Sequence, residues 1–451
     1  MRDQDRETVP AVPGRYYLKT FGCQMNRHDS ELVSGILETR GWRRADDAEA
    51  ADLILLNTCS VRRRPEEKVW GRLARYRHWK NRRPELVLGV LGCMARLRAE
   101  EIRKRFPEVD IILGPESLHL LGPMAGGGVI SPAEAEPEDC SAVEAVRESP
   151  ISAWVTVSRG CDNYCSYCVV PYARGREISR PPREILEEVR RLGEEGCREV
   201  TLLGQNVNSY RGIDTGGETL DFAGLLRLLD PVEGISRIRF VTSHPRDISP
   251  ALIGAVAGLE KVCEFLHFPA QSGSDAVLRR MGRGYTRDDY LSRVRRLREA
   301  VPGIALASDL IVGFPGESGE DFDRTLDLVG EVGFDQIFAF AYSPRPGTAA
   351  AQMEDDVPAG VKAARLQKLL ARQKRIAGEK NRQLVGEVRE VLVEGKNRKY
   401  PRRGEGRTRT GKMVFFPWAE GLTGKLVPVR IERSTDLSLY GTIVSPETKD
   451  K

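Results

Sequence analysis

Residues 159–177, RGCDNYCSYCVVPYARGRE, place Cys161, Cys165 and Cys168 on one short loop with the spacing C-x₃-C-x₂-C. The loop directly follows AWVTVS, an apolar stretch that predicts a β-strand. Iron–sulfur clusters bind cysteine thiolates, normally four to a [4Fe–4S] cluster, so three ligands leave one iron open to an external ligand. A structural zinc site is the alternative, but it needs four ligands, and no His or Cys follows before Cys197. The triplet therefore predicts an iron–sulfur cluster with an open iron.

The loop begins a pattern of alternating strands and helices that covers the middle of the chain. Strands are predicted near 154–158, 200–204, 237–243, 265–270, 305–312 and 336–342. Six such units predict a partial (β/α)₆ barrel of the TIM type, whereas a full (β/α)₈ barrel would need two more units. Active sites of these barrels lie at the carboxyl ends of the strands, which is where the cysteine loop begins.

Polar and glycine residues follow several of the predicted barrel strands, in LLGQNVNSY (202–210), FPAQSGSD (268–275) and SDLIVGFPGE (308–317). Glycine allows a ligand to approach the backbone closely, and the polar side chains at this face offer hydrogen bonds. Ordinary loop structure is the alternative explanation for the glycines. We predict contacts to cofactor or substrate from Gly204, Gln205, Asn206, Gln271 and Asp309.

A second set of cysteines lies in the N-terminal region. Strands predicted at 16–22, 51–57 and 86–92, with a fourth apolar run at 110–114, indicate an open parallel α/β sheet. Cys23, Cys59 and Cys93 each follow one of the first three strands, and the carboxyl ends of parallel strands share one edge. A second three-thiolate cluster is therefore predicted, with simple burial of free cysteines as the alternative. Cys140, Cys197 and Cys263 have no partner at ligand spacing and are expected to be structural or incidental.

The C-terminal region is basic, with 22 Lys and Arg against 10 Asp and Glu in residues 360–451. Residues 360–383 predict a basic helix, and short strands at 389–395, 410–416, 424–432 and 437–444 predict a small β-barrel, a type of domain that commonly binds oligonucleotides. Basic side chains neutralise phosphates and aromatic rings stack on unpaired bases, although a solvated charged loop is the alternative. RNA contacts are predicted for Lys396, Arg398, Lys399, Arg402, Arg403, Arg407 and Arg409.

Length and composition indicate the class of protein and its domain organisation. The chain has 451 residues, of which 40% are apolar and 30% charged, as in folded globular proteins. Because no stretch has the roughly 18 uninterrupted apolar residues of a membrane span, and the start lacks the apolar core of a signal peptide, a cytoplasmic protein is expected. The predicted domains are 14–122, a linker at 123–150, 151–383 and 384–447.

Together these motifs resemble the radical S-adenosylmethionine methylthiotransferases over residues 14–446. The segments GCDNYCSYCVVPYARGREISR, LLGQNVNSY, PAQSGSD and YSPRPGTAA (342–350) are most similar to those of the branch that acts on N6-isopentenyladenosine in tRNA. The resemblance implies an N-terminal three-cysteine domain, a central radical domain and a C-terminal TRAM-like barrel. It also implies two [4Fe–4S] clusters, with S-adenosylmethionine as both radical source and methyl donor.

The implied reaction adds a methylthio group at carbon 2 of the adenosine next to the anticodon, position 37 of the tRNA. A 5′-deoxyadenosyl radical formed at the Cys161, Cys165 and Cys168 cluster would abstract the hydrogen, and the second cluster would carry the sulfur. Implied partners are the tRNA anticodon stem-loop, an electron donor protein and a supplier of sulfur or clusters. Alternatives within the family are threonylcarbamoyl-adenosine in tRNA and an aspartate of a ribosomal protein. From a different class, a non-catalytic iron–sulfur RNA-binding protein or sensor is the alternative.

Overall fold

The structure is a computed structural model that describes residues 13–60, 63–125, 144–214 and 216–444. Most of the predicted linker, including Cys140, lies outside these ranges. The chain forms two compact units. The first contains the residues up to Glu148 together with 159–163 and 168–177, and the second contains 149–158, 164–167 and the chain from Ile178 onward.

The first unit is built on a parallel sheet in the order β2-β1-β3-β4-β5. Its strands are β1 (Arg15–Phe21), β2 (Arg43–Arg44), β3 (Leu53–Thr58), β4 (Val87–Leu91) and β5 (Ile111–Leu113). Its helices are α1 (Gln24–Glu38), α2 (Arg63–Lys80), α3 (Cys93–Arg105), α4 (Leu121–Ala125) and α5 (Val170–Arg174), with 3₁₀ turns at η1 (Ala48–Ala50) and η2 (Pro115–Leu120). The open parallel sheet predicted from the sequence is confirmed, and the two-residue edge strand β2 is an addition to it.

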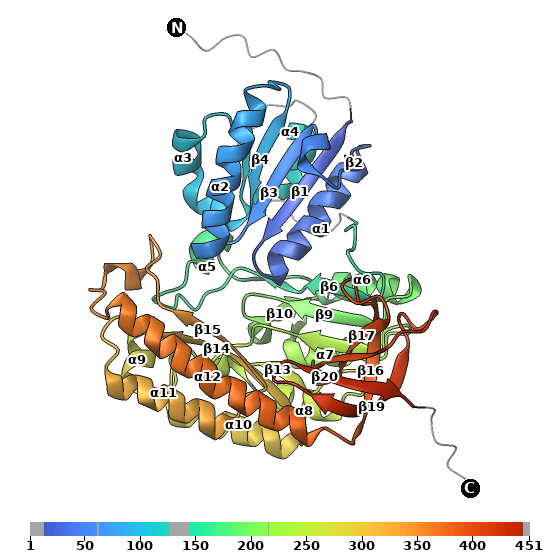
Figure 1. Cartoon of the computed structure of the whole chain (residues 1–451), viewed down its shortest axis with the longest axis vertical. Helices are drawn as coiled ribbons and strands as arrows, with labels where there is room; N and C mark the ends of the chain where they lie inside the picture. Colours follow the sequence, from blue (N-terminus) through green and yellow to red (C-terminus); the bar gives the residue numbers. More distant parts are fainter. Residues whose placement is uncertain (1–12, 61–62, 126–143, 215, 445–451) are drawn as a thin grey trace. The chain divides into compact units, whose positions relative to one another are not determined.

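Both faces of this sheet are covered (Figure 1). Apolar side chains of α1 and α4 pack on one face, and those of α2 and α3 pack on the other. Burial on both faces explains why strands such as LILLNT are almost continuously apolar rather than alternating. The sheet edge at the carboxyl ends of the strands is left for the loops that carry the cysteines.

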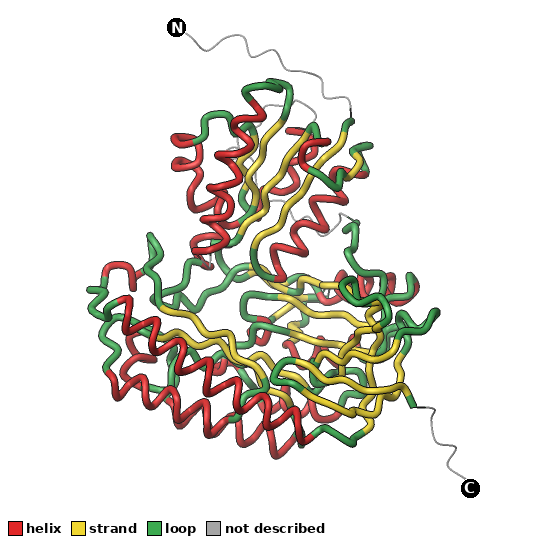
Figure 2. The backbone as a smooth tube through the Cα atoms, in the orientation of Figure 1, coloured by secondary structure: helices red, strands yellow, loops and turns green. Residues whose placement is uncertain are grey.

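The second unit contains the partial barrel. Its six strands are β6 (Ser152–Thr156), β9 (Glu199–Leu203), β12 (Arg237–Phe240), β13 (Phe265–His267), β14 (Ala305–Val312) and β15 (Gln336–Ala341). They form two parallel three-stranded sheets, β6-β9-β12 and β13-β14-β15, which are connected by a parallel bridge between Ile238 and Val262. Strands and helices alternate along the chain as predicted (Figure 2). The six-stranded partial barrel is confirmed.

The helices of this unit are α6 (Pro182–Glu194), α7 (Phe222–Leu229), α8 (Pro250–Gly258), α9 (Asp275–Arg280), α10 (Arg287–Ala300), α11 (Gly319–Val332) and α12 (Ala359–Gln383). Shorter elements are β7 (Ser158–Arg159), β8 (Ile178–Ser179), β10 (Arg211–Ile213), β11 (Thr219–Asp221), η4 (Val207–Ser209), η5 (Pro245–Asp247) and η6 (Ala349–Gln352). In α6, Ile185, Val189 and Leu192 recur at helical spacing and are buried in the barrel core. No helix in the described part of the chain has the length and apolar character needed to cross a membrane.

A closed five-stranded barrel follows α12. Its strands are β16 (Val388–Lys396), β17 (Arg403–Thr408), β18 (Met413–Pro417), β19 (Leu426–Ser434) and β20 (Ser438–Ile443), in the order β16-β17-β18-β20-β19. The sequence predicts four of these strands and misses β17, whose residues RGEGRT contain no apolar side chain. The inward position Gly406 lies so close to its neighbour that a Cβ there would be 2.2 Å from the Leu392 carbonyl oxygen. Glycine thus replaces the apolar residue by which a strand is normally recognised.

Buried arginines of β12 join this small barrel to the partial barrel. Arg237 donates a hydrogen bond to the Arg407 carbonyl oxygen (2.6 Å), and Arg239 donates to those of Thr408 and Arg409 (2.7 Å each). In the opposite direction, Arg409 donates to the Glu264 carboxylate and to the Val262 carbonyl oxygen. The small barrel is therefore a docked part of the second unit.

Candidate metal and cofactor sites

The three N-terminal cysteines follow paired positions of neighbouring strands. Phe21 of β1 pairs with Thr58 of β3, and Asn57 of β3 pairs with Leu91 of β4. Cys23 caps the start of α1, Cys59 comes directly after β3, and Cys93 is the first residue of α3. Since the strands are parallel, this register brings the three cysteine loops to the same edge of the sheet.

Close packing of the loops requires glycine before two of these cysteines. Gly22 and Gly92 have φ of +148° and +85°. A Cβ on Gly22 would lie 2.6 Å from the Cβ of Cys59, and a Cβ on Gly92 would lie 2.8 Å from the Thr58 carbonyl oxygen. The backbone before Cys23 and the backbone before Cys93 thus both lie against the end of β3, so the three loops converge as predicted.

Two buried asparagines fix these loops to one another. Asn26 Nδ2 donates to Asn57 Oδ1 (3.1 Å), and Asn57 Nδ2 donates to the Asn26 carbonyl oxygen (2.8 Å). The Cys23 thiol donates to Asn26 Oδ1 (3.2 Å). A hydrogen bond with Cys59 lowers the pKa of Cys23 although burial opposes it, whereas burial raises the pKa of Cys93. The Cys23 thiol is therefore more acidic than the Cys93 thiol.

The first unit also brings Arg174 to this site, a residue that the sequence does not single out. Arg174 ends α5, six positions after Cys168, and its Nη2 lies 2.6 Å from Asp29 Oδ2 on α1. The positive charge of the Arg174 guanidinium acts to lower the pKa of both Cys23 and Cys93, although burial outweighs it at Cys93. Both Arg174 and Asp29 are buried, with side-chain exposures of 5% and 8%. The motif PYARGRE gives no sign of this placement, because it depends on where α5 packs.

The loop of the second cysteine set divides between the two units. In the first unit, the Cys161 amide donates to the Gly175 carbonyl oxygen (3.2 Å), and Asn163 Nδ2 donates to Cys161 Sγ (3.4 Å). In the second unit, Arg283 donates from Nη1 to Cys165 Sγ (3.3 Å) and from Nη2 to the Pro269 carbonyl oxygen (3.2 Å). Arg283 is 4% exposed. Cys165 is therefore oriented by a buried cation that the sequence analysis missed.

Unpaired polar atoms gather at the carboxyl ends of the barrel strands. Both amide atoms of Gln205, two residues after β9, are buried without a hydrogen-bond partner among the described residues. The same holds for Ser158 Oγ and Ser243 Oγ, which follow the strands on either side of β9, while His267 Nε2 at the end of β13 lies 3.4 Å from the Asp309 carboxylate without a hydrogen bond to it. Buried polar groups normally have partners, so this cluster indicates a place where a ligand supplies them.

The other residues predicted to contact cofactor or substrate lie near this cluster. A Cβ on Gly204 would be 2.5 Å from Ser158 Oγ, which shows how closely the two strand ends approach. The Gln271 amide donates to the Asp309 carbonyl oxygen (2.9 Å), and Asp309 Oδ2 lies 3.4 Å from His267 Nε2. Asn206 differs, because its amide nitrogen donates to Asp247 (2.7 Å) and its oxygen accepts from the His244 amide (3.0 Å). Asn206 thus holds the loop in place, and Gln205 presents the unpaired amide.

The predicted RNA contacts of the small barrel separate into two groups. Five are exposed, namely Lys396, Arg398, Lys399, Arg402 and Arg403. Arg407 is paired with Glu394 (2.8 Å), and Arg409 is paired with Glu264 (2.7 Å). Tyr400 is 49% exposed and lies between Lys399 and Arg403, whose charged groups are 5.4 and 5.0 Å from its ring centre. The exposed group combines positive charge with a half-exposed aromatic side chain, and Arg409 belongs to the docking contact instead.

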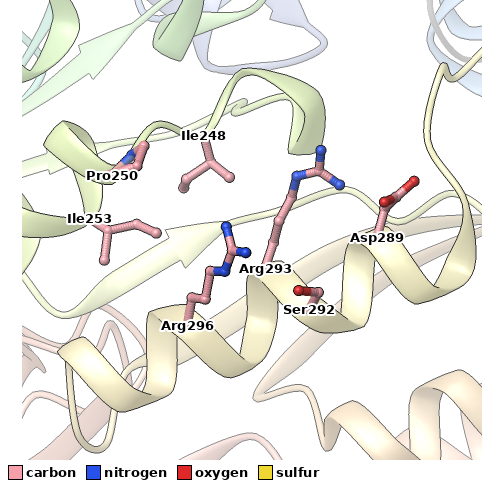
Figure 3. A pocket seen from close by; sticks show the side chains of 7 residues that line it. All are labelled: Ile248, Pro250, Ile253, Asp289, Ser292, Arg293 and Arg296. Carbon is pink, nitrogen blue, oxygen red and sulfur yellow. The ribbon is translucent and has the colours of Figure 1, made fainter.

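A separate pocket of about 380 Å³ lies between α10 and the start of α8 (Figure 3). It is lined by Ile248, Pro250, Ile253, Asp289, Ser292, Arg293 and Arg296. None of the residues predicted to bind cofactor, metal or RNA lines it. In the part of the chain that the structure describes, no three Cys, His, Asp or Glu side chains are placed to share one metal ion. The assignment of the six cysteines to clusters is therefore a prediction that rests on their motifs.

Three family models match successive parts of the chain. Residues 15–114 match the Uncharacterized protein family UPF0004, residues 155–329 the Radical SAM superfamily, and residues 382–444 the TRAM domain. The tRNA-2-methylthio-N(6)-dimethylallyladenosine synthase of Syntrophotalea carbinolica is 46% identical over 424 residues, which cover 92% of this chain and 96% of that protein. The protein of the same name from Acetivibrio thermocellus is 47% identical over 437 residues, or 95% and 91% of the two chains. This chain belongs to the radical S-adenosylmethionine methylthiotransferase family.

The methylthiotransferase is also similar in fold to a solved structure, the radical S-adenosylmethionine methyltransferase TsrM of Kitasatospora setae. The TM-score is 0.55 at 16% identity, covering 75% of this chain and 77% of that one. This likeness concerns the fold alone. The family and enzyme class predicted from the cysteine motifs are confirmed by the curated relatives, and membership of the radical superfamily implies S-adenosylmethionine and a [4Fe–4S] cluster.

Proposed function

We propose that this methylthiotransferase converts N6-isopentenyladenosine at position 37 of tRNA to its 2-methylthio derivative. One observation carries the proposal: relatives named for this reaction are 46% and 47% identical over more than nine-tenths of the chain. The tRNA anticodon stem-loop is accordingly the proposed partner. An electron donor protein, a supplier of sulfur or clusters, the cytoplasmic location and the domain limits stay predictions.

Two three-cysteine sets are proposed to hold [4Fe–4S] clusters. Cys161, Cys165 and Cys168 would hold the cluster that, when bound, supplies the electron for reductive cleavage of S-adenosylmethionine. Cys23, Cys59 and Cys93 would hold a second cluster for sulfur. The surroundings of Cys59 fit such a group, since the buried hydroxyls of Thr58 and Ser60 have no hydrogen-bond partner in the described structure. Two donors beside the thiol are thus available to cluster or ligand sulfur.

The barrel residues are proposed to bind and orient the cofactor and the base. Gln205 offers one donor and one acceptor, and Ser158, Ser243 and His267 add polar groups at adjacent strand ends. Arg283 fixes the direction of the Cys165 thiol. An anticodon-loop nucleotide is unpaired. Moving it to the carboxyl ends of the barrel strands therefore costs less free energy than extruding a base from a duplex. The exposed basic group of the small barrel would hold the phosphates on either side of the base.

The substrate can be tested with anticodon stem-loops that differ only at position 37. Anaerobically reconstituted full-length protein, dithionite and S-adenosylmethionine are incubated with stem-loops carrying adenosine, N6-isopentenyladenosine or threonylcarbamoyl-adenosine. We expect 2-methylthio product from the isopentenylated loop alone, detected by mass spectrometry. Product from the threonylcarbamoyl loop in place of the isopentenylated loop would show that the sister substrate is correct.

A matched pair of cysteine variants can show whether this protein is an enzyme or a non-catalytic sensor. Cys165→Ala should abolish 5′-deoxyadenosine formation because it removes a proposed cluster ligand. Cys197→Ala removes an equally buried cysteine whose thiol donates to the Ile151 and Glu199 carbonyl oxygens, and it should keep the activity. Absence of 5′-deoxyadenosine with the unaltered protein would favour the sensor.

A further inference from the structure

Arg174 is a buried cation at the N-terminal cysteine site, by which we mean Cys23, Cys59 and Cys93. Its guanidinium donates to Asp29 on α1, the helix capped by Cys23, and α5, which carries Arg174, packs against α3, which begins at Cys93. Burying a cation is unfavourable unless it is paired and hydrogen-bonded, and well-packed apolar residues are often at least as stabilising as a buried ion pair. Stability of the fold therefore gives little reason for the Arg174 and Asp29 pair, and its place beside the helices that begin at Cys23 and Cys93 indicates a role at the site.

The geometry suits an anionic ligand. A guanidinium presents five N–H donors in a planar fork, and the hydrogen bond to Asp29 Oδ2 takes one of them. Charge-assisted hydrogen bonds from such donors are roughly twice as strong as neutral ones. Thiolates that ligate metal are anions, and sulfur arriving at an open iron as hydrosulfide or thiolate adds a further negative charge to a buried place.

We propose that Arg174 is a positioning residue that stabilises anionic sulfur at the N-terminal cysteine site, with Asp29 holding the guanidinium in place. This inference rests on the proposed function, because it takes the three cysteines as ligands of a cluster with an open iron. Its consequence is that the chain leaving the C-x₃-C-x₂-C loop contributes a charged group to the other three-cysteine set, since Arg174 lies six residues after Cys168.

The test uses full-length protein with Cys161, Cys165 and Cys168 replaced by Ala, which isolates the N-terminal cluster. This parent, reconstituted and reduced, is titrated with sodium sulfide while its electron paramagnetic resonance signal is followed. R174Q should raise the half-saturating sulfide concentration about tenfold, as expected for loss of one charge-assisted hydrogen bond. R174K keeps the charge and should recover part of the affinity.

The reduction potential of the same cluster gives a second measurement. R174Q removes a positive charge, disfavours the added electron and should lower the potential. D29N leaves the Arg174 charge uncompensated and should raise it. A merely structural pair would not shift the potential in opposite directions, because both substitutions break the same contact. R105Q, which removes an exposed arginine paired with Glu101 on α3, should change neither quantity.

The outcomes separate this inference from the proposed function. A parent variant that binds iron but shows unchanged sulfide affinity and potential with R174Q would overturn the role of Arg174. If R174Q loses its iron, the reduction potential of the D29N variant becomes the test of the role of Arg174. An unchanged or lowered potential in D29N would overturn that role. A parent variant that binds no cluster would instead overturn the proposed function at this site.

Discussion

At the residue scale, a buried arginine lies beside each three-cysteine set. Arg283 donates to Cys165 Sγ, and the charge of Arg174 acts to lower the pKa of Cys23 and Cys93. Both arginines are almost fully buried, and each is held by further contacts, to Tyr285 in the first case and to Asp29 in the second. Because an arginine stays protonated at any ordinary pH, each set keeps a fixed positive charge beside its thiols.

Gln205 gives a residue-scale prediction in which stability and binding change in opposite directions. Both of its amide atoms are buried and unpaired within the described structure, so the folded protein without ligand already bears the desolvation cost. Gln205→Met removes the polar atoms at similar volume. We expect unchanged or higher thermal stability of the protein without cofactor, together with roughly tenfold weaker S-adenosylmethionine binding by calorimetry.

The matched control is Gln373 on α12. Its Nε2 donates to the Phe334 carbonyl oxygen (2.9 Å), whereas its Oε1 has no partner in the described structure, so Gln373→Met removes one unpaired atom but leaves a buried acceptor without its donor. This variant should lose about 1–3 kcal/mol of stability and bind S-adenosylmethionine normally. Normal binding by Gln205→Met would show that the unpaired amide has no part in the cofactor site.

At the element scale, one carboxylate connects three elements of the second unit. Asp335, just before β15, accepts from Lys380 of α12 (2.6 Å) and from Lys412 next to β18 (2.9 Å). It also accepts from the backbone amide of Leu306 in β14 (3.1 Å). Asp335 therefore joins the partial barrel, the basic helix and the small β-barrel.

This junction predicts an acid-sensitive contact. Burial would raise the pKa of Asp335, but Lys412 and Lys380 outweigh it and hold the pKa below its ordinary value. A carboxylate with a lowered pKa stabilises the folded state above its unfolded pKa of about 3.9, and this stabilisation disappears as the pH falls through the folded value. Asp335→Asn should remove that pH-dependent part and lower the unfolding midpoint at pH 7.

The measurement is thermal unfolding of both proteins between pH 3 and pH 7. The difference in midpoint should be largest at pH 7 and shrink toward the acid end. Asp323→Asn is the control, because Asp323 is an exposed residue of α11 whose ion pair with Lys368 (3.3 Å) is worth little. A difference that stays constant with pH would contradict the assignment to Asp335.

The elements also show what the sequence could and could not predict. The cysteine loops were predictable because strand ends in a parallel sheet share one edge, which makes Cys23, Cys59 and Cys93 equivalent by topology. Strand β17 was missed because Gly406 takes the place of an apolar residue. Arg174 and Asn206 could not be assigned, since one depends on the packing of α5 and the other on a hydrogen bond to Asp247. The local sequence pattern identifies where strands end. Packing between distant parts of the chain determines which side chains are available to bind a ligand.

At the scale of the whole molecule, the docked small barrel changes how the RNA contact should be tested. Arg237 is fully buried and donates to the Arg407 carbonyl oxygen and to Glu390. Deleting residues 384–451 would expose this cation and break the contact, so a truncation would confound RNA binding with loss of stability. Substitutions on the exposed surface avoid this problem.

The exposed basic group predicts a specific change in salt dependence. Each phosphate contact contributes about 0.7 to 0.9 to the slope of log affinity against log salt concentration. Replacing Arg398, Lys399 and Arg402 together by Gln should therefore lower the slope for tRNA by about 2 to 3. Cofactor cleavage should continue, because these exposed side chains lie on the small barrel and carry no cluster ligand. Fluorescence anisotropy with labelled tRNA at several salt concentrations measures the slope.

Two controls locate the contact. Replacing Arg103, Lys104 and Arg105, three exposed residues at the end of α3, removes the same charge from another surface and should leave the slope unchanged. Arg409→Gln should weaken thermal stability more than it changes the slope, because Arg409 is bound to Glu264 and the Val262 carbonyl oxygen. If the α3 variant lowers the slope as much as the barrel variant, net charge rather than the barrel surface attracts the tRNA. If neither variant does, the phosphates are held by a surface outside both groups.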